Sequence, residues 1–201
     1  MDKNKKIIFS VIGLIILIAL VIGVTYAAFS YSKAGSTLNT ITTGTITMTS
    51  NEAKNGITID NALPMNEEEG KLLSADNQVF DFTTNLEIAG NTSISYEVTA
   101  QKDISSTLSD ENVRLYLQKC TDGSSYNDEV LNPTKYTPIT SDDEYGAKTG
   151  EMILDTGSTS SNATYYYRLR MWVDSSYEIS EVSKSFTVTL NVYAKQGNIT
   201  K

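Results

Sequence analysis

An alternating stretch of aromatic and cationic residues is the strongest candidate for binding chemistry in this sequence. Tyr166, Arg168, Arg170 and Trp172 fall at every second position, so an extended strand would display all four on one face. Aromatic and arginine side chains dominate the energetics of many binding interfaces, and a guanidinium is attracted to an aromatic ring face. The pattern therefore predicts a face that docks a glycan or a protein. The alternative is a covered face or an ordinary cross-strand ladder.

The single cysteine, Cys120, is the second candidate for chemistry. It ends the apolar-alternating stretch 113–119 and has the parity of Arg114, Tyr116 and Gln118, which places it away from the apolar side. A lone cysteine cannot form an intrachain disulfide, but an accessible thiol outside the cell could link two chains. An interchain disulfide and a passive structural cysteine are both left open.

Catalytic and metal chemistry find little support. The chain has no histidine, which excludes an imidazole base and a zinc site built from His and Cys. The acidic runs Glu67–Glu69 and Asp142–Glu144 lack the alternating spacing of a calcium loop and are typical of solvated charge. Nothing marks any other carboxylate as buried or paired. We therefore predict no enzyme activity, no catalytic residue, no metal site and no cofactor.

The charge balance restricts the class of partner. The chain carries 16 Lys and Arg against 24 Asp and Glu, a formal net charge of −8. Such a field repels a polyanion, so nucleic acid is not expected as a partner.

The first 29 residues have the composition of an export signal. Lys3, Lys5 and Lys6 precede Ile7–Val24, an uncharged run whose only polar residue is Ser10. At 1.5 Å per residue the run would span about 27 Å as a helix, close to the thickness of a bilayer core. Because no polar face interrupts it, a buried core helix is a poor alternative. The lysines favour a cytoplasmic N-terminus with the rest of the chain outside.

The fate of this segment has two readings. Small residues around Ala27 and Ala28 predict cleavage between them by a signal peptidase. Against cleavage, the apolar run is longer than the core of an ordinary signal peptide, so a retained membrane anchor is the alternative. We divide the chain into a signal or anchor segment (1–27), an N-terminal arm (28–40) and an extracellular domain (41–201).

The exported domain is dominated by strand-like alternation. Phe80–Ile88 and Ile94–Ala100 each alternate apolar and polar residues, and the turn residues 89–91 between them predict a β-hairpin. Further strands are expected at residues 43–49, 57–60, 113–119, 152–155, 165–173 and 186–194. Their number and one-sided polarity predict an all-β, two-sheet antiparallel sandwich of jelly-roll or immunoglobulin-like type.

Two stretches depart from this pattern. Met65–Leu73 predicts a short helix, with Asn66 as its N-cap, although Gly70 weakens it. Residues 121–150 are polar and predict a surface excursion with a short strand near Tyr136.

A resemblance appears where the signal segment meets the domain. Residues 26–32 read Tyr-Ala-Ala-Phe-Ser-Tyr-Ser, and residues 39–46 read Asn-Thr-Ile-Thr-Thr-Gly-Thr-Ile. This junction resembles that of the camelysin/TasA group of exported proteins from Gram-positive bacteria. The resemblance implies a jelly-roll-like sandwich, general secretion and trimming by a dedicated signal peptidase. For the best-known member it also implies biofilm fibres, in which the freed N-terminal segment of one subunit adds as a strand to the next. The metalloprotease activity described for camelysin is not carried over, because this chain has no histidine.

The leading expectation is therefore a structural or adhesive protein of the cell surface or extracellular matrix, in which the arm 28–40 would join subunits by strand addition. The alternative is a membrane-anchored module that binds glycan or protein through the Tyr166–Trp172 face. Expected partners are the membrane, at least transiently, the signal peptidase, and further copies or other surface proteins.

Overall fold

The computed structural model describes residues 30–34, 44–50, 56–74, 78–88, 92–179 and 183–196; for residues 30–34, 44, 45 and 50 it describes the backbone alone. The predicted apolar segment, Ile7–Val24, and the predicted cleavage site at Ala27 and Ala28 lie outside these ranges. Among the described residues, no helix has the length and apolar character needed to cross a membrane.

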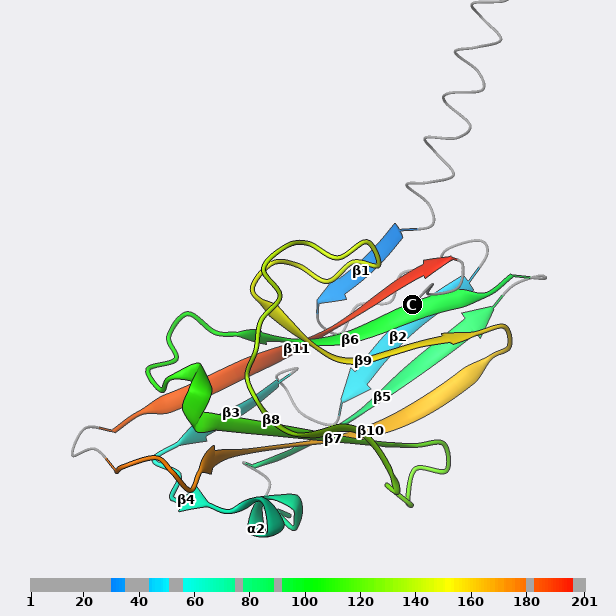
Figure 1. Cartoon of the computed structure of the whole chain (residues 1–201). Helices are drawn as coiled ribbons and strands as arrows, with labels where there is room; N and C mark the ends of the chain where they lie inside the picture. The colour runs from blue at the N-terminus through cyan, green and yellow to red at the C-terminus, as the bar shows by residue number, and fades with distance from the viewer. Residues whose placement is uncertain are drawn as a thin grey trace, which may run out of the picture.

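Two mostly antiparallel sheets make up the described chain (Figure 1). Sheet A has the order β1-β11-β6-β9, with β3 also paired to β11. Its strands are β1 (Ser30–Ala34), β3 (Gly56–Asp60), β6 (Ile94–Lys102), β9 (Glu151–Thr159) and β11 (Ser185–Gln196).

Sheet B has the order β2-β5-β10-β7-β8, and β4 adds a short parallel pairing to β10. Its strands are β2 (Gly44–Ser50), β4 (Pro64–Met65), β5 (Val79–Ile88), β7 (Val113–Cys120), β8 (Asp128–Lys135) and β10 (Ala163–Asp174). The all-β, two-sheet antiparallel architecture is thus confirmed, while its jelly-roll or immunoglobulin-like character stays a prediction.

The core lies between the two sheets and follows the strand alternation. In β5, Phe80, Phe82, Thr84 and Leu86 are buried, while Asp81, Thr83 and Asn85, which alternate with them, are more exposed. Phe82 stacks on Tyr167 of the neighbouring β10, with ring centroids 4.9 Å apart and planes 9° from parallel. These side chains belong to one continuous cluster to which both sheets contribute. Burial of this apolar surface is the main stabilising term.

The predicted hairpin is wrong. Phe80–Ile88 and Ile94–Ala100 are indeed strands, β5 and β6, but they lie in different sheets. Strand β5 pairs with β2 and β10, whereas β6 pairs with β11 and β9. Alternation determines which side of a strand is apolar, but both partners of a sandwich require the same pattern, so it does not identify the neighbour.

The predicted short helix is present as α2 (Glu67–Lys71). Asn66 accepts from the Glu69 amide at 2.9 Å, and the Glu69 carboxylate accepts from the Asn66 amide at 3.2 Å. This reciprocal capping box satisfies two amides that would otherwise lack partners at the helix start. A single turn of 3₁₀ helix, η1 (Asp110–Asn112), precedes β7.

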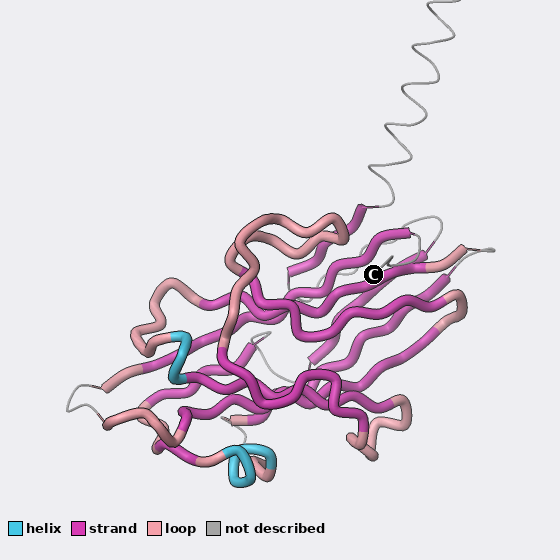
Figure 2. Tube along the Cα trace, viewed as in Figure 1, coloured by secondary structure: helices cyan, strands magenta, loops and turns pink. Residues whose placement is uncertain are grey.

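Each sheet carries a cover on its outer face. The segment 66–73, which contains α2, lies against sheet B below β10 and is called the sheet B cover. The segment 136–150 follows β8 and crosses sheet A near β6 and β11 (Figure 2); it is called the sheet A cover. It is part of the predicted polar excursion, but the strand within that excursion, β8, ends at Lys135, just before Tyr136.

Candidate functional site

The four residues of the predicted binding face lie on the outer side of β10. The residues that alternate with them, Tyr167, Leu169, Met171 and Val173, belong to the core between the sheets. Strand pairing arranges the outer residues in rows across sheet B. Tyr166 lies between Thr83 of β5 and Cys120 of β7, and Arg168 lies between Asp81 and Gln118. The shared face thus exists, but its two halves differ in exposure.

Trp172 and Arg170 are covered, so for this half of the face the alternative of a covered face holds. Trp172 is fully buried beneath Gly70 of α2, where an added Cβ would lie 2.3 Å from an indole carbon. Arg170 is 9% exposed; its Nε donates to the Leu73 carbonyl at 2.8 Å, and its Nη1 donates to Gln118 Oε1 at 2.5 Å. The physical reason is the sheet B cover, whose glycine allows the helix to sit directly on the tryptophan ring.

Tyr166 and Arg168 form the open half of the face. Arg168 binds Asp81 with two parallel hydrogen bonds, Nε to Oδ1 at 2.8 Å and Nη2 to Oδ2 at 2.6 Å. The ring of Tyr126, from the loop after β7, lies over the guanidinium with its centroid 4.3 Å from Cζ. The hydrogen bonds that Arg168 donates to Asp81 raise the pKa of Arg168, so the guanidinium stays charged.

These side chains surround a hollow of about 390 Å³ on the outer face of sheet B, which we call the outer hollow. Its lining includes Thr49, Asp81, Thr83, Tyr126, Tyr166 and Arg168. Asp81 and Tyr126 were not recognised from the sequence. Asp81 has the outward parity of β5, but only the pairing of β5 with β10 places it opposite Arg168. Tyr126 lies in a loop, where no periodicity reports its orientation.

Cys120 is buried, which agrees with a passive structural cysteine and not with the accessible thiol that an interchain disulfide needs. It belongs to the outer row of Tyr166, as its parity indicated, but is 8% exposed and unpaired. The position of a residue in the strand alternation predicts which face it lies on, but not whether a loop covers that face. An interchain disulfide through Cys120 stays a prediction, and it requires the thiol to be uncovered first.

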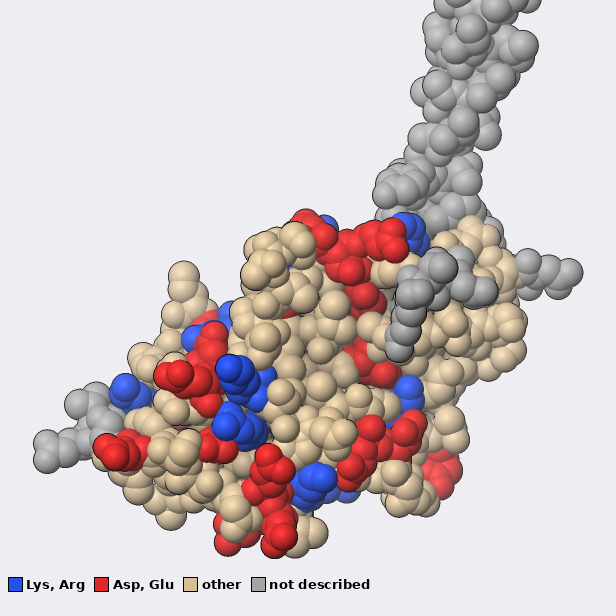
Figure 3. All heavy atoms as spheres, in the orientation of Figure 1, with Lys and Arg blue, Asp and Glu red and all other residues tan. Residues whose placement is uncertain are grey.

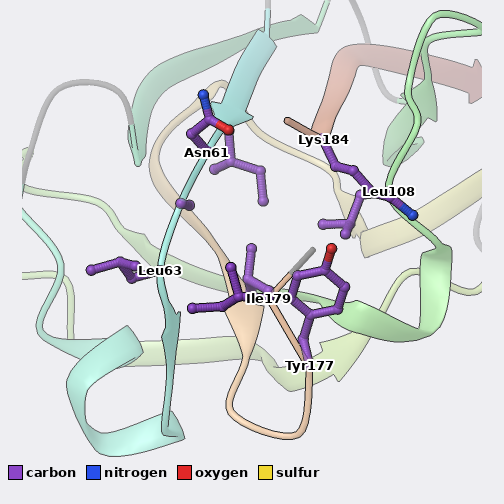
Figure 4. Close-up of a pocket in the computed structure, with 9 residues that line it drawn as sticks. Asn61, Leu63, Leu108, Tyr177, Ile179 and Lys184 are labelled. Carbon is purple, nitrogen blue, oxygen red and sulfur yellow. The ribbon is translucent and has the colours of Figure 1, made fainter. Parts of the chain in front are cut away.

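A second hollow, at the end of the sandwich near β3 and β4, is small and is lined by apolar side chains together with Asn61 and Lys184 (Figure 4). Its lining includes Leu63, Leu108, Tyr177 and Ile179, of which Leu63 and Ile179 are each 69% exposed. Its volume is about 70 Å³, well below the roughly 300–1,000 Å³ of small-molecule sites. It has room for about one side chain, so the outer hollow is the better candidate site.

Two buried carboxylates on the outer face of sheet A correct the expectation that no acid is buried. Glu97 and Glu151 are each 2% exposed beneath the sheet A cover. Glu151 accepts four hydrogen bonds, through Oε1 from Asn191 and Tyr193 and through Oε2 from Thr99 and the Lys148 amide. A carboxylate with this many fixed donors is held in place as a structural acceptor.

Glu97 is buried next to a second acid, Asp143 of the sheet A cover. It accepts a hydrogen bond from the Ala147 amide at 3.3 Å. Burial, followed by the neighbouring charge of Asp143, raises the pKa of Glu97 to about 7. Neither Glu97 nor Glu151 lines the two hollows described above. In the described part of the chain, no group of three or more acidic or cysteine side chains is placed to hold a metal ion.

An ion pair also joins the two sheets inside the sandwich. Lys119 Nζ of β7 lies 3.1 Å from Asp155 Oδ2 of β9, and the Tyr167 hydroxyl donates to the same oxygen at 2.8 Å. Burial lowers the pKa of Lys119, but the Asp155 carboxylate outweighs it and the pKa is raised. Lys119 therefore stays charged, and its contact with Asp155 bridges the two sheets, a structural role.

Acidic and basic side chains are interspersed over the molecular face drawn in Figure 3. On that face, the described residues form no continuous basic patch. The acidic run 67–69 is exposed at the start of α2, where negative charge is favourable next to the helix N-terminus.

Comparisons with known proteins identify no family. No protein-family model matches the chain, and no curated protein matches it. Among solved structures, one similar chain is VP2 of infectious bursal disease virus, with a TM-score of 0.35 and 10% identity over 77% of this chain. This chain spans 33% of the length of VP2.

Two bacterial domains are also similar. The K1 cleaved adhesin domain of Lys-gingipain from Porphyromonas gingivalis has a TM-score of 0.27 and 11% identity over 83% of this chain and 97% of its own. A Clostridium perfringens domain solved with GalNAc-β-1,3-galactose has a TM-score of 0.23 and 15% identity, covering 69% of this chain and 94% of its own. Likenesses this distant carry no conclusion about function, which is argued below from the geometry of this chain.

Proposed function

We propose that this chain is an exported surface protein whose sandwich serves as an adhesion module, binding an extracellular partner through the outer hollow. The observation that carries the proposal is the open half of the outer face of sheet B. There two tyrosine rings, from β10 and from the loop after β7, flank a bidentate Arg168–Asp81 pair around about 390 Å³ of space.

The construction of the hollow suits binding because its polar groups are held before a partner arrives. Asp81 fixes Arg168 from the neighbouring strand, and the ring of Tyr126 lies over the guanidinium. Groups that are already ordered lose less conformational entropy on association. Aromatic and arginine side chains are also the residue types that most often dominate interface energetics.

The exported location remains part of the proposal and follows from the sequence of residues 1–29. Cleavage between Ala27 and Ala28 would release the module, while retention of Ile7–Val24 would hold it at the membrane. The N-terminal sequence of the protein recovered from the surface of a Gram-positive host distinguishes the two outcomes.

The test of adhesion compares two double variants of the full chain displayed on such a host. Tyr166→Ala with Arg168→Ala should abolish attachment of the host to extracellular matrix or to neighbouring cells, while leaving the melting temperature within a few degrees. The matched control is Tyr145→Ala with Lys195→Ala. It also removes a tyrosine and a cation, which lie 5.6 Å apart (Lys195 Nζ to ring centroid), but on the sheet A side. Attachment that survives the first pair, or is lost equally with both, contradicts the proposal.

A second function, self-assembly by strand exchange, is favoured by the edge of β11. Two five-residue strands share that edge: β3 pairs with residues 185–189, and β1 pairs with residues 191–195. Strand β1 lies in the predicted N-terminal arm, and the same backbone ladder would form if β1 of one copy paired with β11 of another. This would join subunits without a new interface.

Strand exchange is tested with a cysteine pair. Ser30 and Lys195 lie opposite each other in the β1–β11 register. The Ser30→Cys, Lys195→Cys chain, in a Cys120→Ser background, should form interchain disulfides and a ladder of oligomers on a non-reducing gel at high concentration. Monomer with only an intrachain disulfide at every concentration refutes exchange. The single variant Ser30→Cys controls for random oxidation.

A further inference from the structure

We infer that the outer hollow binds a neutral pyranose unit of a glycan. Tyr126 or Tyr166 would stack against the apolar face of the sugar, and the Asp81–Arg168 pair would bind its hydroxyls. The inference rests on the proposed adhesion function and names the class of ligand that the hollow takes.

The charge of the hollow favours a ligand without net charge. Asp81 and Arg168 neutralise each other, and the rest of its lining is uncharged. An acidic sugar would bring its carboxylate to a guanidinium already bound by Asp81, within repulsive range of that carboxylate. The net charge of −8 adds to the repulsion. A cationic ligand would in turn meet Arg168.

The two tyrosines supply the apolar contact. Both Tyr126 and Tyr166 are half-buried, so one side of each ring packs on the protein while the remainder lines the hollow. Gly123 lies close to the Tyr166 ring, where an added Cβ would sit 3.3 Å from it, so the loop after β7 packs against this ring. A pyranose presents C–H groups on one face and hydroxyls at its edge, which matches the amphipathic character of a tyrosine ring.

The ion pair supplies adjacent donors and acceptors. Arg168 uses Nε and Nη2 for Asp81, and among the described residues Nη1 has no protein partner. Each Asp81 oxygen keeps acceptor capacity beyond the one hydrogen bond it receives from Arg168. A donor beside an acceptor is the arrangement that two neighbouring sugar hydroxyls require, because each hydroxyl both donates and accepts. Thr49 and Thr83, paired across β2 and β5, add further hydroxyls to the lining.

The size of the hollow sets the expected affinity. At about 390 Å³ it is at the lower end of the range for small-molecule sites, which suits one or two sugar units. Because the hollow is open and a single sugar ring has few atoms, we expect a Kd on the order of 1 mM for a monosaccharide. Useful adhesion would then come from many copies on one surface.

The test uses saturation-transfer NMR on the full chain, purified in a detergent without a sugar head group. The probes are the methyl pyranosides of glucose, galactose, mannose and N-acetylglucosamine, with methyl glucuronide as the acidic comparison. At least one neutral probe should receive saturation from aromatic protons and bind at least tenfold more tightly than the glucuronide. Tyr126→Ala and Arg168→Gln should each weaken that binding at least tenfold, whereas Tyr145→Ala should leave it unchanged.

Three outcomes overturn the inference: no transfer to any neutral probe, transfer that persists in both hollow variants, or tighter binding of the glucuronide. Tyr166→Phe guards against misfolded variants, because it keeps the ring and should keep binding within about threefold. The inference and the proposed function fail separately. If the Tyr166, Arg168 double variant loses adhesion but the wild type binds no sugar, the glycan inference is refuted and the adhesion function stands. If the wild type binds sugar but the double variant keeps its adhesion, the hollow is a sugar site and the proposed adhesion function is refuted.

Discussion

The outer faces of the two sheets are built from similar strands but differ in how far they are covered. On sheet A, the cover 136–150 buries the outward residues of β6, including Glu97 and Thr99, so that every residue from Ile94 to Ala100 is buried. On sheet B, the cover 66–73 stops at Arg170 and leaves Arg168 and Tyr166 open. A polar position on a strand is thus not by itself an exposed one. The candidate site lies where a cover ends.

The largest effect is expected from removing the residue on which the sheet B cover rests. Trp172→Ala should lower the free energy of unfolding by about 3–5 kcal/mol, because a fully buried aromatic side chain is replaced by a cavity. Urea denaturation followed by circular dichroism measures this. Tyr166→Ala, on the same strand and face but half-buried, should cost much less. Equal costs for the two variants would mean that the two halves of the face do not differ as described.

Removing Glu151, the buried hydrogen-bond acceptor beneath the sheet A cover, should have the next largest effect on stability. Glu151→Ala leaves the buried donors of Asn191, Tyr193 and Thr99 without their carboxylate, at a cost of about 3 kcal/mol. The exposed Glu144 of the same cover is the control, and Glu144→Ala should change stability by less than about 0.5 kcal/mol. The measurement is again denaturant unfolding. A small effect of Glu151→Ala would show that the cover is held by other contacts.

The sheet A cover should also make stability depend on pH. The folded-state pKa of Glu97, about 7, lies above its ordinary value of 4.5, so the folded protein holds this proton more tightly than the unfolded chain. Its stabilising contribution is complete below pH 4.5 and is lost as the pH rises through 7. We expect a loss of roughly 2 kcal/mol between pH 5 and pH 8.

Glu97→Gln should remove this part of the pH dependence, because the amide cannot ionise. Denaturation curves from pH 5 to pH 8 for the wild type, for Glu97→Gln and for the exposed Glu67→Gln provide the check. Identical slopes for the three proteins would contradict the assignment. Asp143 and Glu151 are the other acids that contribute to the raised pKa, and both lie at the cover, so no decline of this origin is expected from sheet B.

The smallest effect on stability is expected where α2 packs on Trp172. Whether Gly70→Ala stabilises or destabilises the protein tests this contact. Gly70→Ala would stabilise an exposed helix by about 1 kcal/mol, yet here the added Cβ would lie 2.3 Å from the Trp172 ring. We therefore expect destabilisation by about 1–2 kcal/mol. Glu68→Ala, at an exposed position of the same helix, tests the helix without the contact. A stabilised Gly70→Ala protein would show that α2 does not pack on the tryptophan.

Alternation within strands made much of the fold predictable. It identified β5, β6, β10 and β11 and assigned their apolar sides, because a strand with one face against a core must alternate. The pairing of strands was not predictable in the same way. The composition of residues 89–91 predicted a hairpin, whereas β5 and β6 lie in different sheets. Local turn chemistry competes there with long-range packing, and a single sequence does not show which prevails.

The candidate site could be predicted in part for the same reason. The shared face of Tyr166, Arg168, Arg170 and Trp172 follows from their spacing, but their exposure depends on a segment about 100 residues earlier in the chain, whose contact with β10 leaves no periodic signal. Gly70 was the sequence feature that could have indicated this contact. A glycine within a short helix is unfavourable unless something lies against it, and here that is Trp172.

Trp172 is the only tryptophan in the chain, which makes the contact with α2 observable without a label. Its indole is fully buried, and its N–H has no hydrogen-bond partner among the described residues. An indole in such a dry environment fluoresces at short wavelength, and lifting α2 would expose it to water and shift the emission to the red. The tryptophan fluorescence of the native protein therefore reports whether the sheet B cover is closed. The outer hollow contributes tyrosines and no second tryptophan to this signal.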